Sequence, residues 1–211
     1  MSGLTIDPKL SYYENVQNCR KFWNEWDINY RAGKPVDKDE WFMTPQTVNA
    51  YYNPTTNEIC FPAGILQRPF FDPEADDAFN YGAIGVVIGH EMTHGFDDQG
   101  RNYDKNGNMI DWWTACDAEN FNKRAQVCVD FFSAIKVLPD LNANGKLTLG
   151  ENIADHGGLQ VSYNAYKNAT KDAPLKEIDG LTADQRFFLA YAGVWAANTV
   201  SYTHLRAHET K

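Results

Sequence analysis

The sequence has no long apolar run and no cluster of basic residues. No stretch approaches the roughly 18 consecutive apolar residues that a membrane-spanning helix needs, and the N-terminus lacks a basic segment followed by an apolar one. We therefore expect no transmembrane segment in this chain. Lys and Arg number 19 against 28 Asp and Glu, which gives a formal net charge of −9. Because binding to phosphate backbones needs clustered positive charge, this composition argues against a nucleic-acid partner.

The sequence is also poor in cysteine and has no C-x-x-C pair. Its four cysteines are unevenly spaced, at Cys19, Cys60, Cys116 and Cys128. This spacing indicates neither a thiolate zinc site nor a thioredoxin-like motif, and it is compatible with two disulfides or four free thiols. The cysteines therefore leave the compartment open. It does not indicate an oligomeric state.

Apolar residues are plentiful although they never form long runs. They make up 43% of the 211 residues, which argues against disorder and predicts a domain with a substantial core. Their spacing predicts an amphipathic helix over 11–29, a loop over 33–47, and a β-hairpin formed by 48–52 and 58–61. Further helices are expected over 117–135, with Asp117 as N-cap, over 151–169, and from a capping box at Thr182 to about residue 198. The predicted fold class is α+β and predominantly helical.

The most informative pattern is His90-Glu91-Met92-Thr93-His94. Residues four positions apart lie on one face of a helix, so both imidazoles can bind one tetrahedral metal ion. Glu91 follows the first histidine directly, where its carboxylate can reach a metal-bound water without binding the metal itself. The motif therefore predicts a single catalytic Zn²⁺ with His90 and His94 as ligands and Glu91 as the general base. Two structural histidines on a helix are the alternative.

The residues before this motif predict a buried helix. Residues 79–89 are apolar or small, and Asp76 or Asp77 is the expected N-cap of a helix that continues through His94. The glycines in this segment each weaken an isolated helix by about 1 kcal/mol relative to alanine. Their presence therefore predicts close packing against a neighbouring backbone.

A catalytic zinc needs a third protein ligand, and the sequence offers Glu151. Glu151 and Asp155 lie four positions apart on one face of a predicted helix. One carboxylate can bind zinc while the other accepts the free N–H of a ligating histidine, which fixes the orientation of the ring. From spacing alone, a solvated pair of carboxylates is the alternative.

Glu151 also completes an EF-hand-like calcium loop over residues 140–151, which is a competing interpretation. Positions 1, 3, 5, 6 and 12 of that pattern are filled by Asp140, Asn142, Asn144, Gly145 and Glu151. The loop holds few carboxylates, and Pro139 stands where the incoming helix should continue. Calcium would also leave His90 and His94 without a third protein ligand, so the zinc interpretation explains more residues.

Several separate strings of the sequence resemble the neprilysin family of zinc peptidases, which includes the bacterial enzymes called peptidase O. The strings are V-N-A-Y-Y-N-P, F-P-A-G-I-L-Q-R-P-F-F, G-H-E-M-T-H-G-F-D-D-Q-G-R, D-W-W and L-G-E-N-I-A-D-H-G-G-L. They occur in the family's order between residues 10 and 199. The resemblance implies a thermolysin-like zincin catalytic domain with a small β-hairpin at the sheet edge, and it makes the EF-hand pattern accidental.

The resemblance also implies roles for individual residues. It supports the ligands, base and histidine partner named above, which are His90, His94, Glu151, Glu91 and Asp155. Asn49 and Ala50 match a pair that holds the substrate backbone beside an edge strand. Other matches form the apolar pocket for the residue after the scissile bond, and these are Ile65, Phe70, Phe71, Val86, Val87, Val194 and Trp195. Ordinary core packing is the alternative for some of them.

Three further polar residues lie beside these motifs. Asp98 follows His94 at i+4, a spacing that allows it to support the histidine, while a solvated helix end is equally compatible with Asp97 and Asp98. His156 is next to Asp155 in sequence but lies on another helical face, so we expect it at the surface or in packing rather than at a metal.

The chain is expected to consist of a partial zinc metallopeptidase catalytic domain, residues 1–199, and a non-native or disordered tail, residues 200–211. The resemblance implies that an Arg and a His that contact substrate come beyond the end of this chain. Because missing donors of this kind cost about 100-fold or more in rate, we expect a weak or inactive peptidase in this form.

The expected function is zinc-dependent endopeptidase activity on small peptides, with an apolar residue preferred after the scissile bond. Peptide substrates are the expected partners. The alternatives are a calcium-binding module over 140–151, a non-catalytic zinc-binding domain, and an interaction domain without metal.

Overall fold

The computed structural model describes residues 4–196, and the expected tail over residues 200–211 lies outside this range. The chain divides at Glu40 into two compact units. The first is built on helix α1 (Tyr12–Arg31), where the N-cap Ser11 and Glu14 form a reciprocal capping box. On α1 the ring of Trp26 stacks on that of Tyr30, with centroids 5.0 Å apart. The amphipathic helix predicted over 11–29 is therefore present, and no residue of it is buried.

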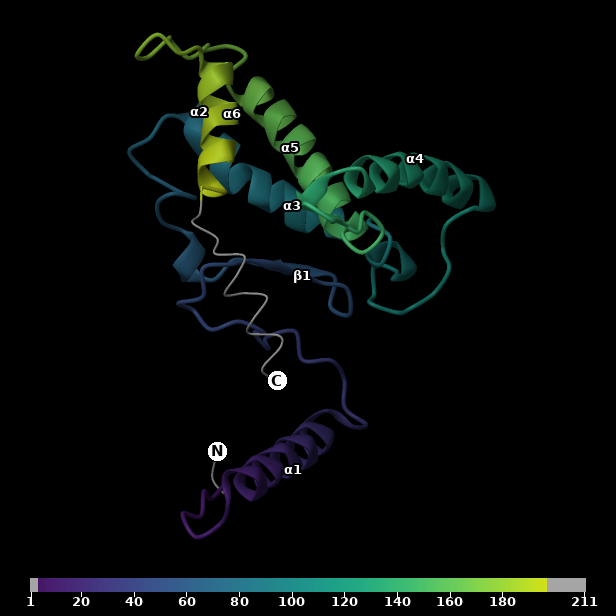
Figure 1. Ribbon diagram of the computed structural model, residues 1–211. Helices are drawn as coiled ribbons and strands as arrows, with labels where there is room; N and C mark the ends of the chain where they lie inside the picture. The colour runs from purple at the N-terminus through teal and green to yellow at the C-terminus, as the bar shows by residue number, and fades with distance from the viewer. Residues whose placement is uncertain (1–3, 197–211) are drawn as a thin grey trace. The chain divides into compact units, whose positions relative to one another are not determined.

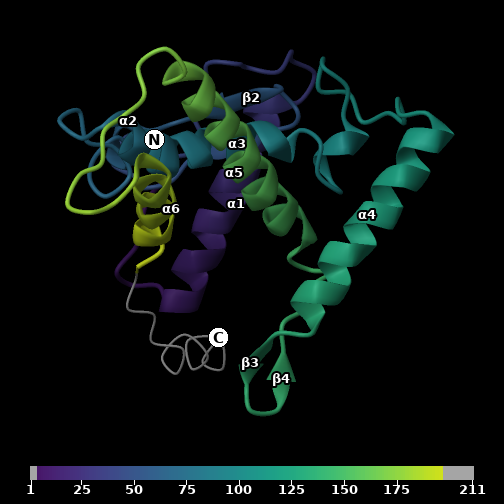
Figure 2. The same ribbon diagram turned by 90° about the horizontal axis from the view of Figure 1, so that it is seen from above.

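The second unit is centred on the contact between helices α3 (Val86–His94) and α5 (Leu149–Ala169). Figures 1 and 2 both show the two helices side by side. Glycine makes this contact close, because a Cβ on Gly89 would lie only 2.8 Å from the Cα of Gly158. The backbones therefore touch where no side chain fits, as the glycines before His90 predicted.

The motif helix is reached through a short irregular segment. Helix α2 (Asp77–Asn80) passes into one π-helical turn, η2 (Tyr81–Gly85), and then into α3. Asp76 is the N-cap of α2, as expected, and its carboxylate accepts the Phe79 N–H at 3.0 Å. Ser162 of α5 donates to the carbonyl of Tyr81 at 2.6 Å, so a side chain satisfies a backbone group of the widened turn.

Two apolar clusters hold this segment in place. The first joins Ala78 and Val86 to Tyr166 of α5 and Phe187 of α6 (Ala183–Val194). The second contains Ala50, Ile65 and Ile84, with Phe61, Phe70, Phe71 and Val87 packed against them. Because the clusters share no residue and both include positions of the 77–94 segment, the core fixes the orientation of the motif helix.

The β-structure is small, as predicted. Strands β1 (Tyr51–Asn53) and β2 (Glu58–Cys60) form an antiparallel hairpin, and within the described residues β1 pairs with no other strand. Short 3-10 turns, η1 (Ala63–Ile65) and η3 (Gly100–Asn102), follow the hairpin and the motif helix, respectively. Helix α4 (Ala115–Ser133) leads into a second hairpin, β3 (Lys136–Leu138) and β4 (Leu141–Asn142), at its end (Figure 2). In the part of the chain from 4 to 196, each helix is too short or too polar to cross a bilayer.

Helix α4 begins earlier than predicted. Its N-cap is Thr114, whose hydroxyl accepts the N–H of Asp117 at 3.1 Å. Asp117 therefore stands inside the first turn and is not the cap, because the threonine three residues earlier already satisfies its N–H. Helix α6, in contrast, opens with the predicted capping box of Thr182 and Gln185.

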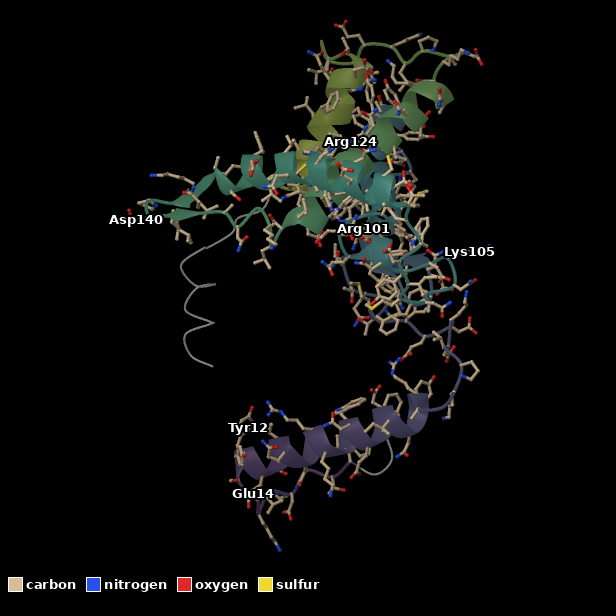
Figure 3. All side chains as sticks on the ribbon, turned by 90° about the vertical axis from the view of Figure 1, so that its right-hand side faces the viewer. Tyr12, Glu14, Arg101, Lys105, Arg124 and Asp140 are labelled. Atoms are coloured by element: carbon tan, nitrogen blue, oxygen red, sulfur yellow. The ribbon has the colours of Figure 1, made fainter. Side chains whose placement is uncertain are left out.

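The EF-hand interpretation of residues 140–151 is contradicted. Asp140 lies in the turn of the β3–β4 hairpin, at the end of the extension seen in Figure 3. The side chains of Asn142 and Asn144 hydrogen-bond to nearby backbone groups at 2.9 and 3.0 Å. They stabilise the local backbone instead of converging with Glu151, which lies in the first turn of α5. Strand pairing over 136–142 replaces the loop that a calcium site requires.

The helix contact gives a stability prediction. We expect Gly89→Ala to lower the melting temperature of the chain, because its Cβ has no space against Gly158 and overpacking of this kind costs about 1–3 kcal/mol. Thermal unfolding followed by circular dichroism measures the effect. Gly193→Ala in α6 is the matched control, since nothing lies within 4 Å of the position of its Cβ. Equal melting temperatures for the two variants would contradict the close contact.

Candidate metal centre

Helices α3 and α5 bring the two sequence motifs together. His90 and His94 project from one face of α3, and their Nε2 atoms are 3.0 Å apart. Oε2 of Glu151 lies 3.3 Å from Nε2 of His90 and 3.7 Å from Nε2 of His94. Ligand atoms on a tetrahedral zinc stand roughly 3.3 Å from one another, given bond lengths of about 2.0–2.1 Å. The spacing of these three atoms therefore fits one zinc ion.

Each histidine is oriented by a carboxylate at its other ring nitrogen. Nδ1 of His90 is 2.8 Å from Oδ1 of Asp155, and Nδ1 of His94 is 2.7 Å from Oδ2 of Asp97. With the proton on Nδ1, both rings direct the lone pair of Nε2 towards the same point. The structure thus places Asp155 beside a histidine of the motif, as the sequence predicted.

The partner of His94 is Asp97, and the suggestion of Asp98 is wrong. The i+4 spacing assumes a continuing helix, but α3 ends at His94. Asp97 has 7% of its side chain exposed and also accepts the N–H groups of Gln99 and Gly100, at 2.8 and 2.6 Å. Burial raises the pKa of Asp97, but these hydrogen bonds outweigh burial and the pKa lies below its usual value. The carboxylate beside His94 is therefore ionised at neutral pH.

Glu91 is the buried acid of the site, with 5% of its surface exposed. Burial raises its pKa by more than the neighbouring histidines lower it. Its ligand atom lies within 4.8 Å of those of His90 and His94, close enough to reach a water at the metal. The position of Glu151 fits that of a third ligand, because its oxygen lies within 3.7 Å of both Nε2 atoms. A carboxylate with a raised pKa suits proton transfer near neutral pH.

The charge of His94 also depends on its surroundings. Burial lowers the pKa of His94, but the hydrogen bond to Asp97 and the charges of Glu151, Asp97 and Glu91 raise it above its usual value. These acidic groups therefore favour positive charge at this point of the site. A cation bound at the Nε2 atoms would experience the same attraction.

The metal-binding atoms face a cleft of about 480 Å³. One wall is the segment of Asn49, Ala50 and strand β1, and the backbone of Tyr52 hydrogen-bonds to Glu91. Asn49 and Ala50, which are expected to hold the substrate, thus line the same cleft as Glu91, the expected base. Within the described residues β1 pairs with β2 alone, so the edge away from β2 pairs with no strand, although the backbone of Tyr52 already binds Glu91.

The apolar residues expected to form a pocket are only partly brought together. Four of them share the cluster that contains Ala50, and these are Ile65, Phe70, Phe71 and Val87. Val86 packs instead with Phe187, because adjacent helical residues point about 100° apart. Val194 and Trp195 stand at the end of α6 and belong to neither cluster as described over residues 4–196.

Several other residues of the cleft were not among those predicted to form the site. These line the side formed by η3 and the following loop, and they are Gln99, Asn102, Tyr103 and Met109. His156 is exposed and its ring lies 6.1 Å from that of Phe132, so it has the surface and packing position that was expected.

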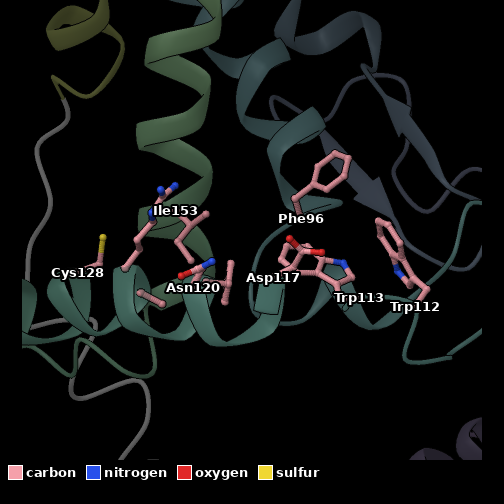
Figure 4. Close-up of a pocket in the computed structure, with 10 residues that line it drawn as sticks. Phe96, Trp112, Trp113, Asp117, Asn120, Cys128 and Ile153 are labelled. Carbon is pink, nitrogen blue, oxygen red and sulfur yellow. The ribbon is translucent and has the colours of Figure 1, made fainter. Parts of the chain in front are cut away.

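A larger hollow of about 650 Å³ lies along α4 (Figure 4). Phe96, Trp112 and Trp113 line one end, and Ile153 reaches it from α5. Among residues 4–196, the metal-binding side chains of His90, Glu91 and His94 lie close together, and this group is in the smaller cleft. Chemistry rather than size therefore identifies the candidate active site.

Comparison with known proteins agrees with this geometry. Residues 49–211 match the model of peptidase family M13. The chain belongs to peptidase family M13, the neprilysin family. Neprilysin-3 of Drosophila melanogaster is 46% identical over 206 residues, which cover 96% of the M13 chain described here and 26% of that relative. Endothelin-converting enzyme 1 of Rattus norvegicus is 50% identical over 199 residues, with coverage of 92% and 25%. The M13 chain thus spans about a quarter of the length of these relatives.

Solved structures show the same fold. The M13 chain is similar to the zinc metalloprotease ZMP1 of Mycobacterium tuberculosis in complex with inhibitor, with a TM-score of 0.82 and 48% identity over 90% of this chain and 30% of the other. PepO from Lactobacillus rhamnosis HN001 gives a TM-score of 0.71 and 32% identity, with coverage of 92% and 29%. The predicted predominantly helical zincin fold is confirmed. The M13 match runs beyond Thr199, so the division into 1–199 and 200–211 stays a prediction.

The partner of His90 gives a second testable prediction. We expect Asp155→Ala to weaken Zn²⁺ binding by about 10- to 100-fold, the usual effect of losing a carboxylate that orients a ligating histidine. Competition with a zinc-sensitive dye measures the affinity. Asp155→Asn should lose less, because its amide oxygen still accepts the Nδ1 proton, and Asp172→Ala, at an exposed position, serves as the control. Unaltered affinity in Asp155→Ala would show that Asp155 is only a solvated residue.

Proposed function

We propose that this chain carries the catalytic zinc site of an endopeptidase that cleaves small peptides before an apolar residue. The observation that supports the proposal is the convergence of donor atoms from His90, His94 and Glu151, spaced 3.0 to 3.7 Å apart. M13 peptidases are zinc-dependent, and the nitrogen and oxygen donors found here are those that zinc prefers.

Two groups share the chemistry of the proposed reaction. Zinc, when bound, would polarise the scissile carbonyl and lower the pKa of a water towards about 7. Glu91 accepts a proton from the attacking water, whose oxygen forms a bond to the carbonyl carbon. Glu91 then delivers this proton to the amine as the C–N bond breaks. The burial and raised pKa of Glu91 support this role.

Strand β1 and the cluster next to it are proposed to position the substrate. An extended peptide would pair with the open edge of β1 and contact Asn49 and Ala50, which line the cleft. The cluster beside Ala50 would take the apolar residue after the scissile bond through Ile65, Phe70, Phe71 and Val87. Val86 has a packing role in this proposal, and the contribution of Val194 and Trp195 stays a prediction.

One observation favours a second candidate function, a domain that binds zinc without turnover. The side chain of Glu151 is 70% exposed. Electrostatic stabilisation of a transition state is strong only where water is excluded. The solvent exposure of Glu151 therefore favours a site that binds metal over one that catalyses a reaction.

Metal analysis combined with a cleavage assay tests both candidates. We expect about one Zn²⁺ per purified chain and slow cleavage of a quenched fluorescent peptide before Phe or Leu, lost on chelation and restored by Zn²⁺. Bound zinc without cleavage would support the second candidate. A chain that binds no zinc would contradict both.

A further inference from the structure

One wall of the cleft lies outside all the motifs of the sequence. It is the loop of residues 102–110, which folds back on itself, with the N–H of Asp104 donating to the carbonyl of Asn108 at 2.9 Å. Tyr103 and Met109 face each other in an isolated antiparallel bridge. Residues paired in this way carry their side chains on the same face. Both of them line the cleft that contains the metal-binding atoms.

This loop is held firmly against the turn between β1 and β2. Gly107 has a φ of +80°, and a Cβ there would lie 1.9 Å from the carbonyl oxygen of Thr55. The side chain of Asn57 donates to the carbonyl of Lys105 at 3.3 Å. Behind the loop, the indole N–H of Trp112 donates to the carbonyl of Tyr103 at 2.8 Å. The loop is therefore a preformed wall of the cleft.

The neighbours of β1 show which end of the cleft this wall occupies. Ala50, before β1, packs with Ile84, which precedes α3. Further along β1, a Cβ on Gly95, directly after α3, would lie 3.4 Å from the hydroxyl of Tyr52. The β1 segment therefore runs beside α3 from the apolar cluster towards the 102–110 loop. His90, Glu91 and His94 lie between these two ends.

We propose that Tyr103 and Met109 form the subsite for the residues that precede the scissile bond, and that this subsite prefers a large apolar side chain. The proposal rests on the function proposed above. If the residue after the scissile bond occupies the cluster beside Ala50, the preceding residues must pass the metal-binding atoms and reach the opposite wall.

The chemistry of this wall explains the preference. The side chain of Met109 is largely free, since the residue is 71% exposed, and its flexible thioether adapts to apolar groups of different shapes. The ring of Tyr103 adds a rigid aromatic surface. A peptide with Phe before the scissile bond fits these surroundings better than one with Ser.

Peptide binding to the zinc-loaded Glu91→Gln chain tests the proposal, because a bound peptide then stays intact. Two fluorescent peptides are compared by anisotropy. They share Leu after the scissile bond and differ only in having Phe or Ser at the two positions before it. We expect the Phe peptide to bind about 10-fold more tightly, since even one methylene in an apolar pocket gives roughly 10- to 200-fold discrimination. We call the affinity for the Phe peptide divided by that for the Ser peptide the affinity ratio. Adding Met109→Ser should reduce this ratio to below about 3-fold and leave the affinity for the Ser peptide nearly unchanged.

Two further variants test the role of the 102–110 loop and control for nonspecific effects of substitution. Gly107→Val, which displaces the loop from Thr55, should also reduce the ratio, while Leu147→Ser, at a position 80% exposed and outside the cleft, should preserve it. Equal binding of the two peptides, or a ratio that survives Met109→Ser, overturns the subsite and leaves the proposed function intact. If neither peptide binds in a zinc-dependent way, the proposed function fails and the subsite fails with it.

Discussion

Replacing Glu91 with Gln will leave zinc bound and remove peptide cleavage. The amide keeps the shape of the carboxylate but cannot accept a proton from water, and a positioned general base contributes about 10²- to 10⁴-fold to the rate. Zinc affinity should change little, because the three donor atoms closest to the common point come from other side chains. Zinc content and the cleavage rate of a quenched fluorescent peptide, measured on the same preparation, give both quantities.

Glu58→Gln is a matched control for this variant, since it makes the same chemical change on β2, outside the residues that line the cleft. It should retain zinc and the original rate. Substantial turnover by pure Glu91→Gln protein would remove Glu91 from the role of base. Loss of zinc from the same variant would instead assign Glu91 as a ligand.

Glu151→Ala will lose the metal itself. Two histidines alone hold zinc poorly, because protein zinc sites use at least three protein ligands. The loss of affinity should exceed that of Asp155→Ala, and so be more than about 100-fold. Glu177→Ala, at an exposed position before α6, is the control and should bind zinc normally. The assignment of Glu151 would be abandoned if the variant retained zinc at unchanged affinity.

The local part of the site was predictable because it depends on helix geometry alone. His90 and His94 share a face of any helix that includes them, and the helix geometry then determines where Glu91 lies relative to them. Asp76 as N-cap and the glycines of the motif helix followed from equally local rules. The position of Glu151 could not be predicted from helix geometry alone, since only the contact between α3 and α5 brings it to the histidines. In the sequence analysis, the resemblance to the neprilysin family supported the association of Glu151 with His90 and His94.

The errors have a common physical cause, which is that local patterns do not show where an element ends or what packs on it. Asp98 was suggested on the assumption that α3 continued past His94. Asp140 fitted a calcium loop by position while its segment pairs as a hairpin. Tyr103 and Met109 gave no signal, because their place in the cleft depends on the contact of Gly107 with Thr55, which is distant in sequence.

The contact of Gly89 with Gly158 has a consequence for metal selectivity. The histidines belong to α3 and Glu151 belongs to α5, so the separation of the two helices sets the distance between the donor atoms. A small ion such as zinc requires that distance to be short, whereas a larger ion with longer bonds tolerates a wider one. With glycine on both sides, the helices approach as closely as their backbones allow. We therefore expect this pair of glycines, which lies directly behind His90 and outside the lining of the cleft, to favour a small ion.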